Sequence, residues 1–149
     1  MRQEKSAGAV IYCMSNEPLF LFLKNTLKTT YWEFPKGKIE INEPVESTVK
    51  REIKEETNLD KIEIVPGFKH TLQWFFKFQG DLVKKEAVYL LAKIKLAEKE
   101  KVKISKEHQD FKWLTLEQAM QVTKIKANKE MLLKAFDFIE EHEKQKTLA

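Results

Sequence analysis

Residues Gly37 to Leu59 read GKIEINEPVESTVKREIKEETNL, and this segment contains the strongest structural signal of the chain. Its second half has the periodicity of a helix, because apolar residues recur there at every fourth position. These residues are Val45, Val49 and Ile53. Proline suits the first position of a helix, and asparagine tolerates the left-handed conformation that ends one. Pro44 and Asn58 therefore predict a helix over residues 44–57.

Acidic side chains border the apolar stripe of this helix. On a helical wheel of about 100° per residue, Glu52 and Glu56 fall within about 20° of Val45, and Glu55 completes an i, i+3, i+4 cluster. Burying like charges is costly unless a positive charge joins them. Mg²⁺ prefers carboxylate oxygens and leaves room for phosphate oxygens. The cluster predicts a metal site for phosphate chemistry; the alternative is a solvated helix face on which Arg51 and Glu55 form an ordinary i, i+4 pair.

The basic residues near this helix favour the metal site. Among 27 basic residues, only Arg2 and Arg51 are arginine. The planar guanidinium of Arg51 can hold neighbouring carboxylates in a fixed geometry. Residues 35–38, Pro-Lys-Gly-Lys, are expected to form a tight basic loop that brings a backbone carbonyl and lysine ammonium groups to the same place.

The rest of the chain predicts strands and two further helices. A hairpin is expected from 7–14 and 19–24, a polar loop at 26–30, and strands at 31–34, 62–65, 68–78, 87–94 and 111–114. Thr115 and Gln118 have the spacing of a capping box that opens a helix, and a last helix is expected over 128–143. This order predicts an α/β (α+β) fold, with a mixed β-sheet flanked by helices.

The same stretch resembles the Nudix box, G-x5-E-x7-R-E-U-x-E-E-x-G-U, in which U is an aliphatic residue. The matching residues are Gly37, Glu43 and the run Arg51-Glu52-Ile53-Lys54-Glu55-Glu56-Thr57-Asn58-Leu59. Asn58 stands where the family usually has glycine, and asparagine is the next-best residue in that conformation. The resemblance implies a Nudix-like α/β/α sandwich formed by a single domain, residues 1–149.

The resemblance also implies a reaction and its residues. Similar enzymes hydrolyse nucleoside diphosphates linked to another moiety, with Mg²⁺ or Mn²⁺ bound by the helix glutamates. The implied metal-site residues are Glu52, Glu55, Glu56 and Glu107, together with Gly37 in the sharp loop. Arg51 would orient the glutamates, while Glu52 or a neighbouring carboxylate such as Glu55 would take the proton from the attacking water. Which glutamate is the base stays open.

Outside the box, the chain resembles the asymmetrical bis(5'-nucleosyl)-tetraphosphatases, which split diadenosine tetraphosphate into ATP and AMP. The segments that carry this likeness are 32–37, 67–74 and 107–114. The implied substrate-binding residues are Tyr31, Lys36, Trp74, Lys85 and Tyr89. Trp74 would stack on adenine, and the lysines would contact phosphates. Ile125 falls where the family has a second stacking ring.

Each of these residues has a plainer interpretation. Trp74 alternates with Leu72 and Phe76, which favours burial in the core. Lys85 could be a solvated hairpin lysine, and Tyr89 could pack in the core. We expect a structural, hydrogen-bonding role for His108, and surface positions for His70 and His142. The competing functions are a broader Nudix pyrophosphatase, acting on nucleoside triphosphates or RNA 5' ends, and a non-catalytic nucleotide-binding module.

Composition limits the partners. The 149 residues suffice for one domain, and a net charge of +4 spread along the chain does not predict nucleic-acid binding. Cys13 is the single cysteine, so no intrachain disulfide can form, and burial as a small apolar group is expected. No apolar run approaches the roughly 20 residues of a membrane span. We expect a cytoplasmic monomer whose partner is a small-molecule dinucleoside polyphosphate.

Overall fold

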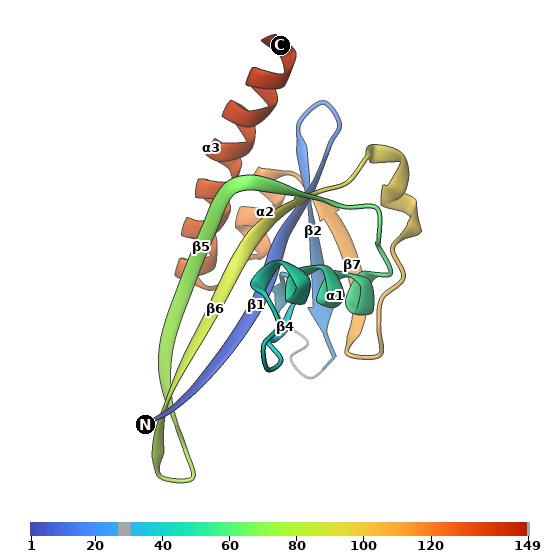
Figure 1. Ribbon diagram of the computed structural model, residues 1–149. Coiled ribbons are helices and arrows are strands. Elements are labelled where there is room, and N and C mark those ends of the chain that lie inside the picture. The colour runs from blue at the N-terminus through green and yellow to red at the C-terminus, as the bar shows by residue number, and fades with distance from the viewer. Residues whose placement is uncertain (27–30, 149) are drawn as a thin grey trace.

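The computed structural model describes residues 1–26 and 31–148, so most of the polar loop expected at 26–30 lies outside the described residues. A mixed sheet carries helices on both faces (Figure 1), which confirms the predicted α/β fold. The elements are β1 (Arg2–Met14), β2 (Pro18–Asn25), β3 (Trp32–Glu33), β4 (Lys36–Lys38), α1 (Val45–Thr57), β5 (Glu63–Phe78), β6 (Asp81–Lys93), the 3₁₀ helix η1 (Leu96–Lys101), β7 (His108–Leu114), α2 (Leu116–Val122) and α3 (Lys126–Leu148).

The sheet is organised around β1. The strand order is β3-β2-β1-β6-β5, with β7 paired to β2 and β4 paired to β1. The β1–β6 pairing is parallel and the other pairings are antiparallel. The expected hairpin is confirmed as β1–β2. The loop expected at 35–38 is instead largely strand β4, in which Gly37 pairs with Ala7. This pairing places residues 36–38 beside residues 6–8 in the middle of β1.

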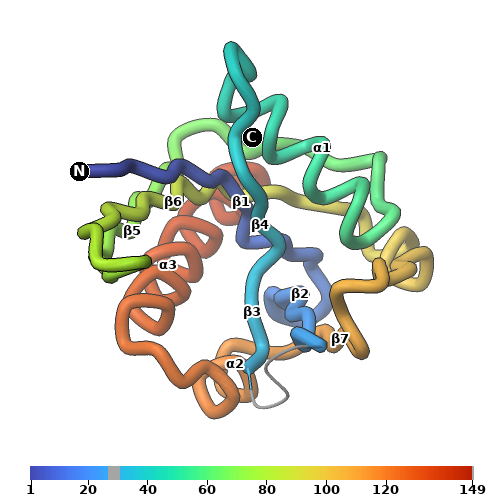
Figure 2. Tube along the Cα trace, turned by 90° about the horizontal axis from the view of Figure 1, so that it is seen from below, coloured from blue at the N-terminus to red at the C-terminus, as the bar shows by residue number. Residues whose placement is uncertain are grey.

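The two faces of the sheet build two hydrophobic cores. Side chains alternate along β1, so Val10 and Tyr12 join the core under α2 and α3, whereas Ile11 and Cys13 join the core under α1. We call these the α3-side core and the α1-side core. Figure 2 shows α1 on one side of β1, with α2 and α3 on the other. Cys13 is fully buried, as predicted.

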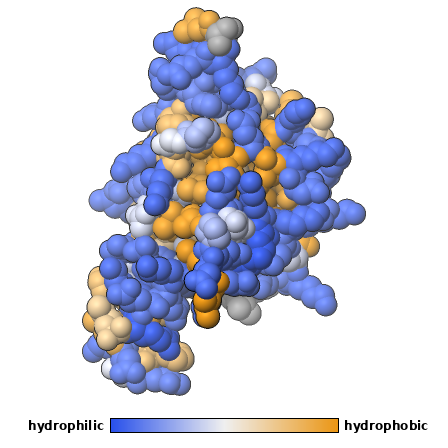
Figure 3. All heavy atoms as spheres, viewed as in Figure 1, coloured by the Kyte–Doolittle hydropathy of each residue, from blue (hydrophilic) through white to orange (hydrophobic). Residues whose placement is uncertain are grey.

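Strands β5 and β6 form a long hairpin that extends beyond the body of the molecule (Figure 1). The two strands predicted at 62–65 and 68–78 are one strand with an irregularity between Ile64 and Lys69, where Gly67 has a φ of 97°. Apolar side chains stay exposed toward the tip of the hairpin (Figure 3), among them Phe75, Phe78 and Leu82. The hairpin therefore carries its distal side chains away from both cores.

The helix boundaries follow the predicted signals closely. Pro44 is the N-cap of α1 rather than its first residue, and Asn58 ends the helix with a φ of 67°. The capping box of Thr115 and Gln118 is confirmed. Helix α3 is longer than predicted, and Glu143 near its end accepts hydrogen bonds from Lys93 and Tyr12 of the sheet. No helix in the described part of the chain has the length and apolar character needed to cross a membrane.

Candidate active site

Arg51, in the middle of α1, organises the acidic residues of the Nudix box. Its Nε and Nη2 donate to the two carboxylate oxygens of Glu43, both at 2.9 Å, and its Nη1 donates to Glu52 Oε1 at 2.8 Å. Its Nη2 also donates to the backbone oxygen of Lys38 at 3.0 Å. The hydrogen bonds from Arg51 lower the pKa of Glu43 to about 2. One guanidinium thus fixes both the loop before α1 and the first glutamate of the cluster.

The Glu52 carboxylate packs directly against the backbone of Gly37. A Cβ atom at Gly37 would overlap the Glu52 carboxylate, and a Cβ atom at Gly8 would overlap Pro35 and Lys36 of the same segment. The Ala9 N–H donates to the Pro35 oxygen at 3.0 Å and holds this segment on β1. Glycine is required at both positions because the backbones and the carboxylate approach too closely for a side chain.

Glu56 is the buried member of the cluster. Its residue exposure is 5%, and its Oε2 has no hydrogen-bond partner among the described residues. Burial raises the pKa of Glu56 to about 8, and the neighbouring charges of Glu52, Glu107 and Glu33 contribute to this rise, while a backbone hydrogen bond from Lys36 opposes them. Burial also raises the pKa of Glu52. An orphaned, inward-facing carboxylate oxygen calls for a positive partner.

The remaining predicted metal-site residues lie on the open side of the cluster. The Glu55 side chain is 56% exposed and lies 3.4 Å from Arg51 Nη1. Glu107 is exposed just before β7, and its charge raises the pKa of both Glu52 and Glu56. We call Glu43, Arg51, Glu52, Glu55 and Glu56 the carboxylate centre, with Glu107 facing it.

The carboxylate centre has the donor chemistry of a hard divalent cation. Within residues 1–26 and 31–148, no three His, Cys, Asp or Glu side chains already stand in the geometry of a metal site. The donors are nevertheless all carboxylate oxygens, and the buried Oε2 of Glu56 lacks a partner among the described residues. Oxygen donors with partial solvent access suit Mg²⁺ or Mn²⁺, which keep several waters and leave positions for phosphate oxygens.

His108 lies behind the cluster. Its side chain is 3% exposed, and its Nε2 is 3.7 Å from Glu56 Oε1 and 3.8 Å from Glu33 Oε1. Burial lowers the pKa of His108. The position is enclosed, but His108 Nδ1 has no hydrogen-bond partner among the described residues, so the expected hydrogen-bonding role is not seen. His70 and His142, expected on the surface, are instead partly buried, because His142 stacks on Phe138 of α3 and His70 lies within β5.

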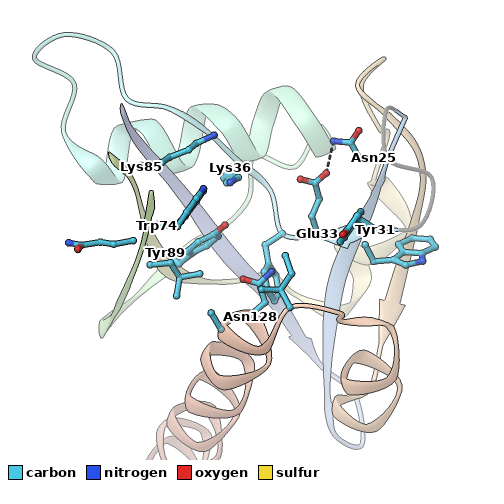
Figure 4. A pocket seen from close by; sticks show the side chains of 14 residues that line it. Asn25, Tyr31, Glu33, Lys36, Trp74, Lys85, Tyr89 and Asn128 are labelled. Carbon is cyan, nitrogen blue, oxygen red and sulfur yellow. Dashed lines mark hydrogen bonds between the residues drawn. The ribbon is translucent and has the colours of Figure 1, made fainter. Parts of the chain in front are cut away.

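A cleft of about 530 Å³ opens on the α3 side of the sheet. It is lined by Asn25, Tyr31, Trp32, Glu33, Phe34, Lys36, Leu72, Gln73, Trp74, Lys85, Tyr89, Ile125, Ala127 and Asn128. All five predicted substrate-binding residues are among them. Figure 4 shows Trp74, Lys85 and Tyr89 close together on one side of the cleft, with Glu33, Tyr31 and Asn25 on the other. Glu33 and Lys36 connect the cleft to the carboxylate centre. The charge of Glu33 raises the pKa of Glu56, and the backbone of Lys36 donates a hydrogen bond to Glu56 that lowers it.

Trp74 is the exposed ring of the cleft. It is 36% exposed, and the ammonium groups of Lys36 and Lys85 lie 5.0 and 5.7 Å from its centroid. The core interpretation of Trp74 is therefore wrong, although Leu72 on the same face does pack against the α3-side core. Lys85 pairs with Trp74 across the β5–β6 hairpin, so it lies beside this ring and lines the cleft.

The other predicted residues form the floor and rim. Tyr89 is 5% exposed and packs edge-on against Phe34, so it belongs to the core and to the floor of the cleft at once. Tyr31 and Ile125 are exposed on the rim. Sequence reasoning did not assign a role to Glu43, although its fixed place in the Nudix box was a signal, and it did not single out Glu33 as a cleft residue.

The family model of the NUDIX domain matches residues 2–136. The chain belongs to the NUDIX family. It is 31% identical over 122 residues to the asymmetrical bis(5'-nucleosyl)-tetraphosphatase of Mus musculus, covering 80% of each chain. It is 33% identical over 119 residues to the enzyme of the same name from Caenorhabditis elegans, covering 79% of this chain and 83% of the relative.

A solved structure extends this similarity to the fold. The binary complex of a C. elegans Ap4A hydrolase superimposes with a TM-score of 0.79 at 31% identity, over 92% of this chain and 98% of that one. The Nudix fold predicted from the sequence is confirmed. The protein is an enzyme, a Nudix hydrolase, and Nudix hydrolases generally use divalent metal ions.

Proposed function

We propose that this Nudix hydrolase cleaves diadenosine tetraphosphate asymmetrically into ATP and AMP, with Mg²⁺ or Mn²⁺ as cofactor. The observation that carries the proposal is the cleft itself. It offers an exposed indole with two ammonium groups nearby, and Lys36, one of its lining residues, donates a backbone hydrogen bond to the buried carboxylate of Glu56. The tetraphosphatases named above support the choice of substrate.

The cleft residues bind and align the substrate. An adenine stacks on Trp74, and the Lys36 and Lys85 ammonium groups neutralise the adjoining phosphates. Tyr31 at the rim adds a phenolic hydroxyl close to the phosphate chain, and Tyr89 forms the apolar floor. The anhydride to be broken then lies over the carboxylate centre.

The carboxylate centre supplies the hydrolytic step. A water oxygen forms a bond to phosphorus, the bridging P–O bond breaks, and its electron pair stays on the leaving phosphate. When bound by Glu52, Glu55, Glu56 and Glu107, a divalent ion supplies charge neutralisation and acidifies the water. Arg51 holds Glu52 in position, and the proton from the water passes to a carboxylate of Glu52 or Glu55.

The test is hydrolysis of diadenosine tetraphosphate in Mg²⁺ and ¹⁸O-labelled water, with separation of the products. We expect ATP and AMP in equal amounts, the label in one product only, and no turnover in EDTA. Formation of ADP alone would indicate symmetrical cleavage and contradict the proposal. Diphosphate release from nucleoside triphosphates, or cleavage of RNA 5' ends, at higher kcat/KM would favour a broader pyrophosphatase. Binding without turnover in Mg²⁺ would favour a nucleotide-binding module.

A further inference from the structure

The cleft has a second tryptophan that neither the Nudix box nor Trp74 accounts for. Trp32, on β3, lines the cleft and is partly buried against the α3-side core. The ammonium groups of Lys24 and Lys112 lie 5.9 and 4.8 Å from its ring centroid. Trp32 pairs with Lys24 on β2, and Lys112 reaches the ring from β7, on the other side of β2.

The surroundings of Trp32 repeat those of Trp74. Each indole has two lysine ammonium groups within about 6 Å, the range of a cation–π contact. An aromatic face beside ammonium groups matches a nucleotide, because a base stacks on the ring and its phosphate pairs with the cations.

We propose that Trp32, Lys24 and Lys112 form a second nucleotide platform, which holds the second nucleoside of a dinucleoside polyphosphate while Trp74 holds the first. This inference rests on the proposed function. Trp74 belongs to β5, which pairs with β6, whereas Trp32 belongs to β3, which pairs with β2. Glu33, the residue after Trp32, lies across the cleft from Trp74 in Figure 4.

This placement fits the path of a polyphosphate. The segment from Trp32 to Lys36 runs from the second platform to Lys36, whose ammonium group lies beside Trp74. Within this segment, Glu33 and the backbone of Lys36 are close enough to Glu56 to change its pKa. A chain of phosphates that joins two stacked bases therefore passes the carboxylate centre. Ile125 also lines the cleft, but its aliphatic side chain offers no ring on which a base could stack. Trp32 is the lining residue besides Trp74 that offers an indole to the second base.

The test compares a ligand with two nucleosides and a ligand with one. Diadenosine tetraphosphate and adenosine 5'-tetraphosphate are titrated by calorimetry in EDTA, and KM is measured for the first in Mg²⁺. Trp32→Leu is expected to weaken binding of diadenosine tetraphosphate, and to raise its KM, by about tenfold. Binding of adenosine 5'-tetraphosphate and kcat are expected to stay within about twofold, and Trp32→Phe is expected to retain most of the affinity.

Trp113→Leu is the matched control, because Trp113 is a partly buried tryptophan on β7 that packs against the α1-side core. It should leave the preference for two nucleosides unchanged. The second platform would be overturned if Trp32→Leu weakened the binding of both ligands equally, or weakened the binding of neither. Wild-type protein that releases no ATP and AMP would instead overturn the proposed function, while the binding preference in EDTA would still decide the role of Trp32.

Discussion

The carboxylate centre and the cleft are built in opposite ways. The carboxylate centre comes from one continuous stretch, and Arg51 ties Glu43, Glu52 and the Lys38 backbone together at 2.8 to 3.0 Å. The cleft draws side chains from β2, β3, β4, β5, β6 and the start of α3, and its tryptophans contact lysines at 4.8 to 5.9 Å. The proposed reaction centre is thus encoded locally in this chain, whereas the proposed substrate cleft is assembled by sheet register.

Neutralising Glu56 should disable the carboxylate centre and spare the cleft. Glu56→Gln removes the buried anionic oxygen, so we expect kcat to fall by at least about a hundredfold with little change in KM. In EDTA at about pH 9, above the pKa of Glu56 of about 8, the free energy of unfolding should stay the same or rise, because repulsion between the ionised Glu56 and Glu52 is relieved. Glu46→Gln, an exposed substitution in the first turn of α1, is the control. Activity near that of the wild type would contradict the assignment of Glu56 to the metal site.

Arg51→Lys tests whether the carboxylate centre depends on a fixed geometry. Lysine keeps the positive charge but loses the paired hydrogen bonds to Glu43, so we expect kcat to fall by about 10- to 100-fold. Steady-state kinetics in saturating Mg²⁺ measure this loss. Arg2→Lys, which changes the other arginine, should have no effect. Full activity in the Arg51→Lys variant would mean that charge alone suffices.

The carboxylate centre was largely predictable because its information is local. Apolar residues recur at every fourth position of α1, and this spacing predicted Glu56 beside the buried stripe; Glu56 is indeed buried. The contact between Glu43 and Arg51 was missed although Glu43 has a fixed place in the Nudix box, since the contact depends on how the loop before α1 folds back onto Arg51. The pairing of β4 with β1 was also missed, because a segment of Lys-Gly-Lys lacks the composition of a strand.

The cleft was less predictable because burial depends on distant elements. Leu72 and Trp74 share one face of β5, and alternation predicts the same burial for both. Of the two, Leu72 packs against the α3-side core, whereas Trp74, which is closer to the turn of the β5–β6 hairpin, is 36% exposed. The approach of Lys112 to Trp32 likewise follows from the pairing of β7 with β2, which sequence spacing does not reveal.

Trp74→Leu tests the cleft, as the substitutions of Glu56 and Arg51 test the carboxylate centre. We expect KM for diadenosine tetraphosphate to rise about tenfold, with kcat within about twofold, because one base loses its stacking partner. The melting temperature should change little, since Trp74 is 36% exposed. Phe75→Leu, at the next position on the opposite face of β5, controls for general effects on the hairpin. A lower melting temperature with unchanged KM would show that Trp74 serves stability instead.

The mildest change we expect concerns acid stability, and it isolates the ion pair that makes the carboxylate centre rigid. Arg51 holds the pKa of Glu43 at about 2 in the folded protein, well below the ordinary value of 4.5. A carboxyl group whose pKa is lower in the folded than in the unfolded protein stabilises the fold at pH values above its unfolded pKa. This stabilisation is lost as the pH falls through its folded pKa. Glu43→Gln should therefore lower the free energy of unfolding by a constant amount above about pH 5, and the deficit should shrink as the pH falls toward about 3. Urea denaturation across this range measures it, with Glu40→Gln, an exposed neighbour 4.0 Å from Arg51, as the control. A deficit that persists unchanged at the acid end of this range would mean that shape, and not the charge of Glu43, connects this loop to Arg51.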